Sequence, residues 1–380
     1  MRAAIPHRAP VSSRGELSVR VLILTADIGA GHDLPAALLA DAIREREPDA
    51  YVVVADGLEA GGRGAQAVAR SGMETILQHA RPVFDLQYWL IARFGPTRRA
   101  GGVLAMALGA RGLLKRIRRE RPDVIVSTYP GTSEVLGRLR RMGRLPVPCV
   151  AAITDLAALH WWAHPGLDLH LMIHAESREE VERVAGPGAD IRHVRGFSRP
   201  EFDAPPSREA ARAALGLPLD RPIVVVSGGG WAVGDLAAAT ETVLARPDAI
   251  AVCLCGTNAG VRSRLSERFA REPRVRVEGF TDRMCEWLSA ADVLVHSTAG
   301  LTMLEAQLCG TWAISYGWGI GHLRLNNRAY RRFGLAAVAT TPPELAAALE
   351  TALAAPRPRF AGYAALPTAA DAVLELAARR

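Results

Sequence analysis

The sequence has 380 residues, of which 49% are apolar and 22% charged. These proportions are those of a globular protein with room for two cores, and they exclude a disordered or fibrous chain. The formal net charge of +7 is carried almost wholly by arginine. It is compatible with nucleic acid, an anionic membrane surface, an acidic substrate, or simply an arginine-rich proteome.

The five cysteines are odd in number and form no Cys-x-x-Cys pair, which favours free thiols in a reducing cytoplasm over a metal site. No apolar run approaches the roughly 18 residues of a membrane-spanning helix. Residues 1–18 contain arginine and proline without an apolar segment, so we expect a disordered leader there.

The first element is an apolar, β-branched run over Val19–Thr25, which is typical of a buried strand. It is followed by the turn Gly29-Ala30-Gly31-His32 and by helical spacing over Leu34–Arg46. Strand, glycine-rich turn and helix open a Rossmann-like unit, whose helix N-terminus offers free N–H groups to an anion. The third glycine of a dinucleotide fingerprint is missing. However, Asp56 after the second predicted strand, Tyr51–Ala55, keeps a nicotinamide enzyme as an alternative.

His32 stands at the start of this helix, beside the glycine turn. The helix dipole favours a neutral imidazole there, and a neutral imidazole is a candidate general base. The plainer alternative is a histidine that only bonds a loop carbonyl.

Residues Gly72–Arg121 combine bulky apolar side chains with clustered cations and few acids. This pattern is typical of a helix that docks on anionic lipid headgroups, so we predict peripheral membrane contact through Trp89–Arg121. A core-facing helix with a solvated arginine face is the alternative. The residues concerned are Phe84, Tyr88, Trp89, Leu90, Ile91, Phe94, Arg98, Arg99, Arg111, Lys115, Arg116, Arg118 and Arg119.

Further strands are predicted over Pro122–Val126, Val147–Ile153, Leu169–Ile173 and Ile191–Val194. The second of these ends in Thr154-Asp155, and the adjacent tryptophans Trp161 and Trp162 follow. Aromatic faces pack well against sugar rings or acyl chains.

The strand–helix rhythm restarts after a proline-rich linker region at 201–220, with a strand over Pro222–Ser227 and the turn Gly228-Gly229-Gly230. We therefore predict an α/β fold with two Rossmann-like domains, 19–200 and 201–380, facing each other across a cleft. A helix from Thr368 closes the second domain.

The stretch Val275–Asn327 contains two polar loops at predicted strand ends. In an open parallel sheet, ligands bind at the carboxyl ends of the strands. This stretch is therefore our candidate for a nucleotide-sugar pocket. Its notable residues are Phe280, Thr281, His296, Ser297, Thr298, Gly300, Thr302 and Glu305.

Taken in chain order, these loops resemble those of GT-B glycosyltransferases. The resemblance is greatest to monogalactosyldiacylglycerol synthases and processive diacylglycerol glucosyltransferases, kin to the peptidoglycan N-acetylglucosaminyltransferase. It extends from about Val21 to Asn327. The matching segments are Gly29–His32, Thr154-Asp155 with Trp162 and His164–Asp168, Gly228–Gly230, Cys255–Asn258, Gly279–Met284 and Gly300–Ala306.

The resemblance implies an inverting transfer from a UDP-sugar to a lipid such as diacylglycerol, without a metal or other cofactor, at the cytoplasmic membrane face. It implies that His32 takes the proton of the acceptor hydroxyl, with Asp155 as its orienting partner. Glu305 would bind the ribose hydroxyls, and Phe280 would line the uracil pocket. The implied donor-binding residues are Gly31, Gly228, Gly229, Gly230, Asn258, Phe280, Thr281, Thr298, Gly300, Leu301, Thr302, Glu305, Gly321, His322 and Asn326.

One loop departs from the family pattern. Relatives place a Gln-Glu pair against the donor sugar, where this chain has His322-Leu323. The sugar, and transfer itself, therefore stay open. Alternatives are a soluble acceptor, a UDP-sugar epimerase, or a nucleotide-sugar-binding protein without catalysis. Nucleic acid is not expected, because the basic segment carries no known binding motif.

Overall fold

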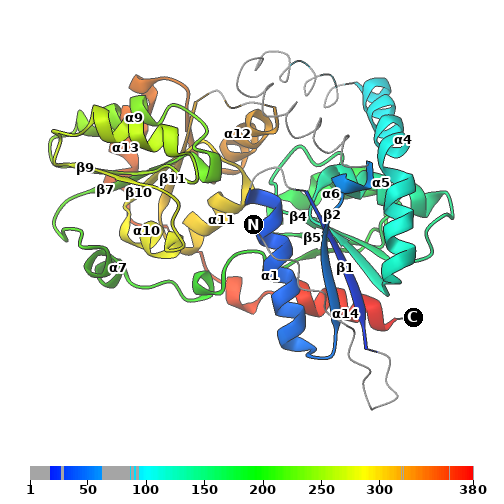
Figure 1. The fold of residues 1–380 in the computed structure, drawn as a ribbon. Coiled ribbons are helices and arrows are strands. Elements are labelled where there is room, and N and C mark those ends of the chain that lie inside the picture. Colours follow the sequence, from blue (N-terminus) through cyan, green and yellow to red (C-terminus); the bar gives the residue numbers. More distant parts are fainter. Residues whose placement is uncertain are drawn as a thin grey trace.

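The computed structural model describes residues 18–26, 30–61, 86, 90, 94–317, 319, 321–358 and 360–379. These residues form two sheets of six strands each (Figure 1). Every strand pair in both sheets is parallel. The predicted fold class, two Rossmann-like α/β halves, is confirmed.

The strand order of the first half is β2-β1-β3-β4-β5-β6. Its strands are nearly continuous runs of Val, Ile, Leu and Ala, because helices cover both faces of a parallel sheet. The strands are β1 (Arg20–Thr25), β2 (Tyr51–Asp56), β3 (Val124–Ser127), β4 (Cys149–Ile153), β5 (Leu169–Met172) and β6 (Ile191–His193). The helices are α1 (Ala30–Arg46), η1 (Leu58–Gly61), α4 (Gly95–Glu120), α5 (Pro130–Arg141), η2 (Ala175–Ser177), α6 (Arg178–Ala185) and η3 (Pro200–Asp203).

The second half is also a parallel sheet, with the strand order β12-β11-β10-β7-β8-β9. Its strands are β7 (Ile223–Ser227), β8 (Ile250–Leu254), β9 (Val275–Glu278), β10 (Val293–His296), β11 (Trp312–Tyr316) and β12 (Ala337–Ala339). The remaining helices, in chain order, are α7 (Arg208–Leu215), η4 (Gly229–Trp231), α8 (Leu236–Leu244), α9 (Ala259–Arg268), α10 (Met284–Ala290), α11 (Gly300–Leu308), α12 (His322–Phe333), α13 (Pro342–Ala354), η5 (Tyr363–Ala365) and α14 (Ala369–Ala378).

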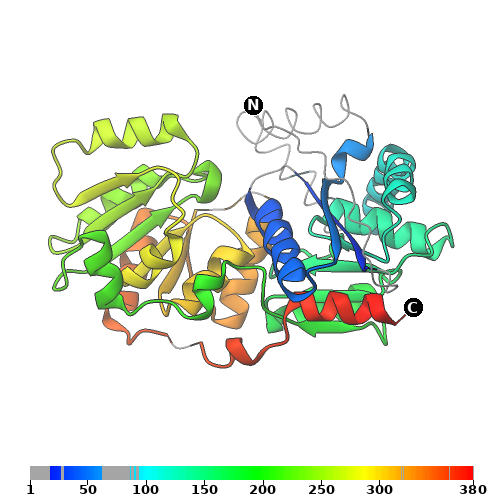
Figure 2. The same cartoon turned by 60° about the horizontal axis from the view of Figure 1, so that its bottom comes forward.

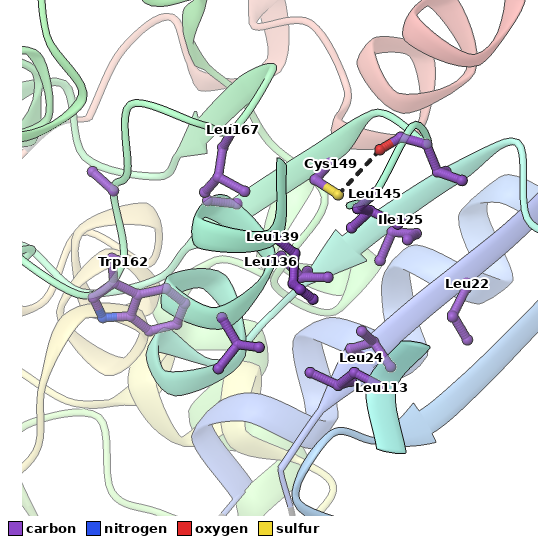
Figure 3. Packing of buried hydrophobic residues seen from close by; sticks show 14 of the residues in the cluster. Leu22, Leu24, Leu113, Ile125, Leu136, Leu139, Leu145, Cys149, Trp162 and Leu167 are labelled. Carbon is purple, nitrogen blue, oxygen red and sulfur yellow. Dashed lines mark hydrogen bonds between the residues drawn. The ribbon is translucent and has the colours of Figure 1, made fainter. Parts of the chain in front are cut away.

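Alternation along β1 divides the first half into two core layers. Leu22 and Leu24 face the layer formed with Leu113 of α4 and Leu136 of α5, which Figure 3 shows from close by. Ile23 faces the opposite layer, which α1 and α14 cover. Buried apolar side chains pack on both faces of β1 and β3, so the ends of these strands are rigid supports for the loops that follow them.

The last helix returns to the first half. Its N-cap residue Thr368 accepts a hydrogen bond from the Asp371 N–H, and Arg195 after β6 pairs with Thr368. Helix α14 then packs beside α1, as the red and blue helices of Figures 1 and 2 show. The chain therefore crosses between the halves twice, and the domain division at residue 200 stays a prediction.

Helix α4 is a 26-residue helix with two different surfaces. Leu113 and Ile117 are buried in the first core, as the core-facing alternative expects, but Val103, Leu104 and Leu108 are each more than half exposed. No helix among the described residues is long and apolar enough to cross a bilayer. The predicted leader, Gly29 and the aromatic residues around Trp89 lie outside the described residues.

Candidate active site

The two halves meet where the loop after β4 contacts the start of α11. A Cβ built on Gly300 would lie only 1.8 Å from the carbonyl oxygen of Thr154, so no other residue fits without moving the halves apart. His174, after β5, places Nε2 2.9 Å from the Gly300 carbonyl oxygen. The strand ends of the two sheets therefore come together at Thr154-Asp155 and Gly300.

His32 lies in the first turn of α1 at this edge of the first sheet. Its Nδ1 lies 2.9 Å from the carbonyl oxygen of Thr128, the residue after β3. Because a carbonyl only accepts, Nδ1 carries a proton, so the lone pair of the neutral form of the ring is on Nε2. The Thr128 hydroxyl donates to the His32 carbonyl oxygen at 3.1 Å, so both residues are held together. This tautomer is the one that a general base at Nε2 requires.

Two aromatic rings enclose His32. The ring of Tyr129 meets it edge-on at 5.2 Å between centroids, and the Trp162 ring lies at 5.7 Å. The indole Nε1 of Trp162 donates to Oδ2 of Asp155 at 3.0 Å. The family resemblance implied Asp155 as an orienting partner of His32, and this role stays a prediction. In the structure the Thr128 carbonyl contacts Nδ1 of His32, and Trp162 contacts both Asp155 and His32.

The remainder of the predicted acceptor block has supporting contacts. Asp168 accepts from the Cys149 N–H at 2.7 Å and pairs with Arg140 of α5. The Gly166 N–H donates to His164 Nδ1 at 3.0 Å. Burial and the nearby arginines lower the pKa of His164 to about 4, so its ring is neutral. These residues fix the loop that carries Trp162 to the end of β4.

The glycine turn after β7 packs tightly on the loop after β10. A Cβ on Gly228 would lie 2.4 Å from the Val233 nitrogen, and one on Gly229 would lie 2.8 Å from Cγ2 of Thr298. Gly229 also has φ of +68°, a conformation that favours glycine. Gly230 follows at the start of η4, and its carbonyl oxygen accepts from the Thr257 N–H at 2.8 Å. The close contacts bring three strand-end loops together.

Helix α11 begins in these loops. Its N-cap, Ala299, offers no side-chain cap, and Leu301 and Thr302 are only partly buried in the first turn. At the head of α1, Gly31 has nothing within 4 Å of a built Cβ. A helix N-terminus without a cap presents several N–H donors, which suit an anionic group.

Glu305 lies one turn further along α11 and is buried. Burial raises its pKa to about 8, with the Cys285 thiol as a second cause, while Arg199 opposes the rise. At neutral pH the side chain is therefore mostly the uncharged acid. An acid can donate to one hydroxyl oxygen and accept from another, whereas the predicted carboxylate would accept from both.

Of the other predicted donor-binding residues, some are exposed to solvent and others form hydrogen bonds that hold loops and helix ends in place. The ring of Phe280 is 65% exposed, and the neighbouring Thr281 Oγ1 accepts from the Arg283 N–H. Asn258 caps α9 by accepting from the Val261 N–H at 3.0 Å, and it donates to the Trp231 carbonyl oxygen at 3.2 Å.

At the start of α12, Gly321 is the N-cap with φ of +55°, and His322 is the first helical residue. Asn326 is fully buried, and its Oδ1 accepts from the Leu156 and Ala157 N–H groups at 3.1 and 3.3 Å. The structure thus places Asn326 against the backbone of the first half. Sequence reasoning gave no role to Thr128, His174 or Tyr330. The only feature of the sequence that could have pointed to them is their position, which is near a predicted strand end for Thr128 and His174 and on α12 for Tyr330.

Comparison with known proteins gives a family for each half. Residues 32–192 match the family model described as monogalactosyldiacylglycerol (MGDG) synthase, and residues 222–355 match that of glycosyl transferases group 1. The chain is 31% identical over 323 residues to a probable monogalactosyldiacylglycerol synthase 2 of Oryza sativa subsp. indica, covering 79% of this chain and 66% of that protein. It is 22% identical over 321 residues to the processive diacylglycerol beta-glucosyltransferase of Bacillus pumilus, covering 84% and 82%. The chain thus spans just under two thirds of the length of the rice relative.

Solved structures show the same architecture. The glycosyltransferase SnogD from Streptomyces nogalater aligns with a TM-score of 0.55 at 20% identity, covering 95% of this chain and 99% of that one. A putative UDP-N-acetylglucosamine 2-epimerase from Listeria monocytogenes also aligns at 0.55, at 13% identity, covering 94% and 95%. The fold by itself therefore does not separate transfer from epimerisation. The chain belongs to the family of monogalactosyldiacylglycerol synthases and processive diacylglycerol glucosyltransferases, which are glycosyltransferases of the GT-B fold.

Proposed function

We propose that the protein is a hexosyltransferase that moves a hexose from a UDP-sugar to a lipid acceptor such as diacylglycerol, with inversion at the anomeric carbon and without a metal or other cofactor. The observation that carries the proposal is the state of His32. Its Nδ1 donates to the Thr128 carbonyl, so the neutral form of the ring has its basic nitrogen at Nε2, and the aromatic rings of Tyr129 and Trp162 lie against the imidazole. The names of the rice and Bacillus pumilus relatives support the lipid acceptor.

In the proposed reaction the acceptor hydroxyl oxygen attacks the anomeric carbon from the face opposite the leaving group. A new carbon–oxygen bond forms, the bond to the diphosphate breaks, and UDP leaves with the electron pair. The hydroxyl proton passes to Nε2 of His32. A positioned base of this kind contributes about 10²- to 10⁴-fold to the rate.

The second half would bind the donor mainly through backbone. The diphosphate would lie against Gly228–Gly230 and the N–H groups that follow Thr298, which supply positive potential without a cation. Glu305 would hold the ribose hydroxyls, and the exposed ring of Phe280 with Thr281 would face the uracil. The sugar would extend towards Gly321 and His322 at the head of α12.

The acceptor would arrive from a membrane surface on which α4 lies. The exposed side chains of Val103, Leu104 and Leu108 are close to a series of cations along the same helix, a combination that suits an anionic bilayer surface. The first turns of α4 contact the acceptor loop directly. Arg98 lies 2.7 Å from His160 Nδ1, and a Cβ on Gly101 would lie 2.9 Å from the Trp161 ring. The protein would thus work as a peripheral enzyme on the inner face of the plasma membrane.

The direct test measures UDP release from UDP-glucose, UDP-galactose and UDP-N-acetylglucosamine, each with and without diacylglycerol. We expect release from one donor, dependent on diacylglycerol, and a β-linked or otherwise inverted product. Release that needs a soluble acceptor would contradict the lipid acceptor. A change in the donor sugar without any acceptor would indicate epimerisation, and UDP binding without either reaction would indicate a binding protein.

Membrane contact is tested by flotation with vesicles of phosphatidylglycerol or of phosphatidylcholine. We expect binding to the anionic vesicles only, and loss of binding in the double variant Leu104→Glu, Leu108→Glu. The matched control is Leu219→Glu, which alters an equally exposed leucine of the second half. Equal binding of all three proteins would remove α4 from the proposal.

A further inference from the structure

Helix α12 belongs to the second half, yet one of its faces holds a loop of the first half. The fully buried Asn326 accepts both the Leu156 and Ala157 N–H groups through Oδ1, at 3.1 and 3.3 Å. Leu156 and Ala157 themselves lie in a core cluster made mostly of second-half residues. The loop after β4 is therefore inserted into the second half and fixed there by its backbone.

Tyr330 follows Asn326 by four residues, so both side chains lie on the same face of α12. Its ring is completely buried and meets the His296 ring at 5.9 Å between centroids. Among the described residues its hydroxyl has no hydrogen-bond partner. Burying a hydroxyl without a hydrogen-bond partner destabilises a folded protein, so its presence calls for a reason.

The charge near this hydroxyl is that of Asp155. Burial is the first cause that raises the pKa of Tyr330, and Asp155 is the second. The phenol therefore stays protonated and available as a donor near the carboxylate. Asp155 already accepts from Trp162 Nε1 through Oδ2, and the Trp162 ring lies against His32. Contacts thus lead from Asp155 through Trp162 to the candidate base, and Asn326 of α12 holds the backbone of the residue that follows Asp155.

A side chain of the first half likewise bonds the backbone of the second half. His174 is buried, and burial lowers its pKa, so the ring is neutral. Since the Gly300 carbonyl only accepts, Nε2 of His174 must donate to it. Each half therefore uses a buried polar side chain to fix the backbone of the other, one at the acceptor loop and one at the first residue of α11.

We propose that Asn326 and Tyr330 are positioning residues, through which α12 of the second half holds Asp155 of the first half in place. Asn326 fixes the loop backbone, and Tyr330 donates its hydroxyl to the Asp155 carboxylate when the substrates are bound. Trp162 and His32 then reach their working geometry only when the two halves are docked. The catalytic part of this inference rests on the proposed function. Asn326 is thereby assigned to the junction of the halves and not to the donor sugar.

The first test is Tyr330→Phe, which removes the hydroxyl and keeps the ring. We expect kcat to fall about 10- to 150-fold, as for the loss of one hydrogen bond to a charged group, with KM for the UDP-sugar within about twofold. The ¹⁵N–¹H signal of the Trp162 indole should shift as well. The matched control is Tyr363→Phe, a buried tyrosine under α14, which should change neither kcat nor that signal. Loss of stability with kcat and the Trp162 signal unchanged would overturn the inference.

The second test does not depend on turnover. In Asn326→Ala, amide hydrogen exchange at Leu156 and Ala157 should accelerate at least about tenfold, while exchange in β7 and β8 stays as in the parent protein. Asn326→Asp, which keeps an acceptor oxygen, should restore most of the protection. Unchanged exchange at the two amides would refute the positioning role, whatever the activity. If no donor and acceptor pair reacts but exchange and the Trp162 signal respond as expected, the proposed function fails and the docking of the loop by α12 stands.

Discussion

Each half has a parallel sheet of six strands, but different groups hold the strand-end loops of the two sheets. At the edge of the first sheet, His32, Trp162 and Asp155 are held by side-chain hydrogen bonds and ring contacts. At the edge of the second sheet, glycines and an uncapped helix N-terminus dominate. The first edge therefore positions the side chains proposed for catalysis, whereas the second presents backbone N–H groups to the donor. Substitutions at the first edge should mainly lower kcat, and substitutions at the second should mainly weaken UDP binding.

The largest expected effect is on the first edge. His32→Ala should lower kcat by about 10²- to 10⁴-fold, because it removes the base, while the Kd for UDP stays within about twofold. Kinetics with saturating donor and calorimetry with UDP measure the two quantities. His193→Gln on β6 is the control. Equal losses of kcat and UDP affinity in His32→Ala would contradict the division between the two edges.

Gly300→Ala should damage both edges at once. Its Cβ would lie 1.8 Å from the Thr154 carbonyl oxygen, so the halves must separate. We expect at least about tenfold losses in both kcat and UDP affinity, and a stability loss of about 1–3 kcal/mol. Urea unfolding and UDP titration measure these changes. Gly95→Ala, where nothing lies within 4 Å of the new Cβ, should be neutral. A fully active Gly300→Ala would show that the junction is looser than described.

Glu305→Gln separates binding from chemistry on the second edge. The amide should weaken UDP binding by about tenfold, as expected for one altered polar contact, and leave the pH dependence of kcat unchanged. Calorimetric titration with UDP, alongside kcat measured from pH 5 to 9, tests both parts.

Stability should respond to the same substitution in a defined pH window. The folded protein holds the Glu305 proton up to about pH 8, while an unfolded glutamate releases it near pH 4.3, so this group's contribution to stability falls as pH rises between those values. The slope is at most about 1.4 kcal/mol per pH unit. In thermal unfolding, the Tm of Glu305→Gln relative to that of the parent protein should therefore be higher at pH 8 than at pH 5. A constant difference would mean that the carboxyl is ionised in the folded protein.

The smallest expected effect on kcat is at Trp162, and the adjacent Trp161 serves as its control. Trp162→Phe removes the Nε1 donor of Asp155 but keeps a ring beside His32, so kcat should fall about three- to fivefold. Trp161→Phe should have no effect on kcat, because Nε1 of Trp161 has no hydrogen-bond partner among the described residues. Parallel assays of both variants decide whether Asp155 acts through Trp162.

Much of the fold could be predicted from the sequence because buried parallel strands are short, nearly continuous apolar runs. Val293–Val295 and Val124–Val126 are examples, and both are central strands. Glycine turns after such runs marked the ligand-binding edges. Helix α14 was harder to place, because its apolar, alanine-rich sequence fits either core.

The candidate site was predictable as a set of residues more than as a set of contacts. His32, Trp162 and Gly300 stand in recognisable patterns and do come to the edges of the sheets. The groups that hydrogen-bond to the site residues do not belong to any sequence pattern. The Thr128 carbonyl belongs to the backbone, and the contact of Asn326 with Leu156 joins residues 170 positions apart. Neither spacing nor composition reports such contacts, since they depend on how the two halves dock.

The return of α14 to the first half has a consequence for synthesis on the ribosome. The first sheet is complete once β6 has emerged, but one of its core layers includes Ala369, Ala370 and Val373. That layer stays open to solvent until α14 has left the exit tunnel. The N-terminal half therefore cannot finish folding ahead of the C-terminal half, as successive domains commonly do during translation. Chains stalled before α14 should expose this apolar face and attract chaperones.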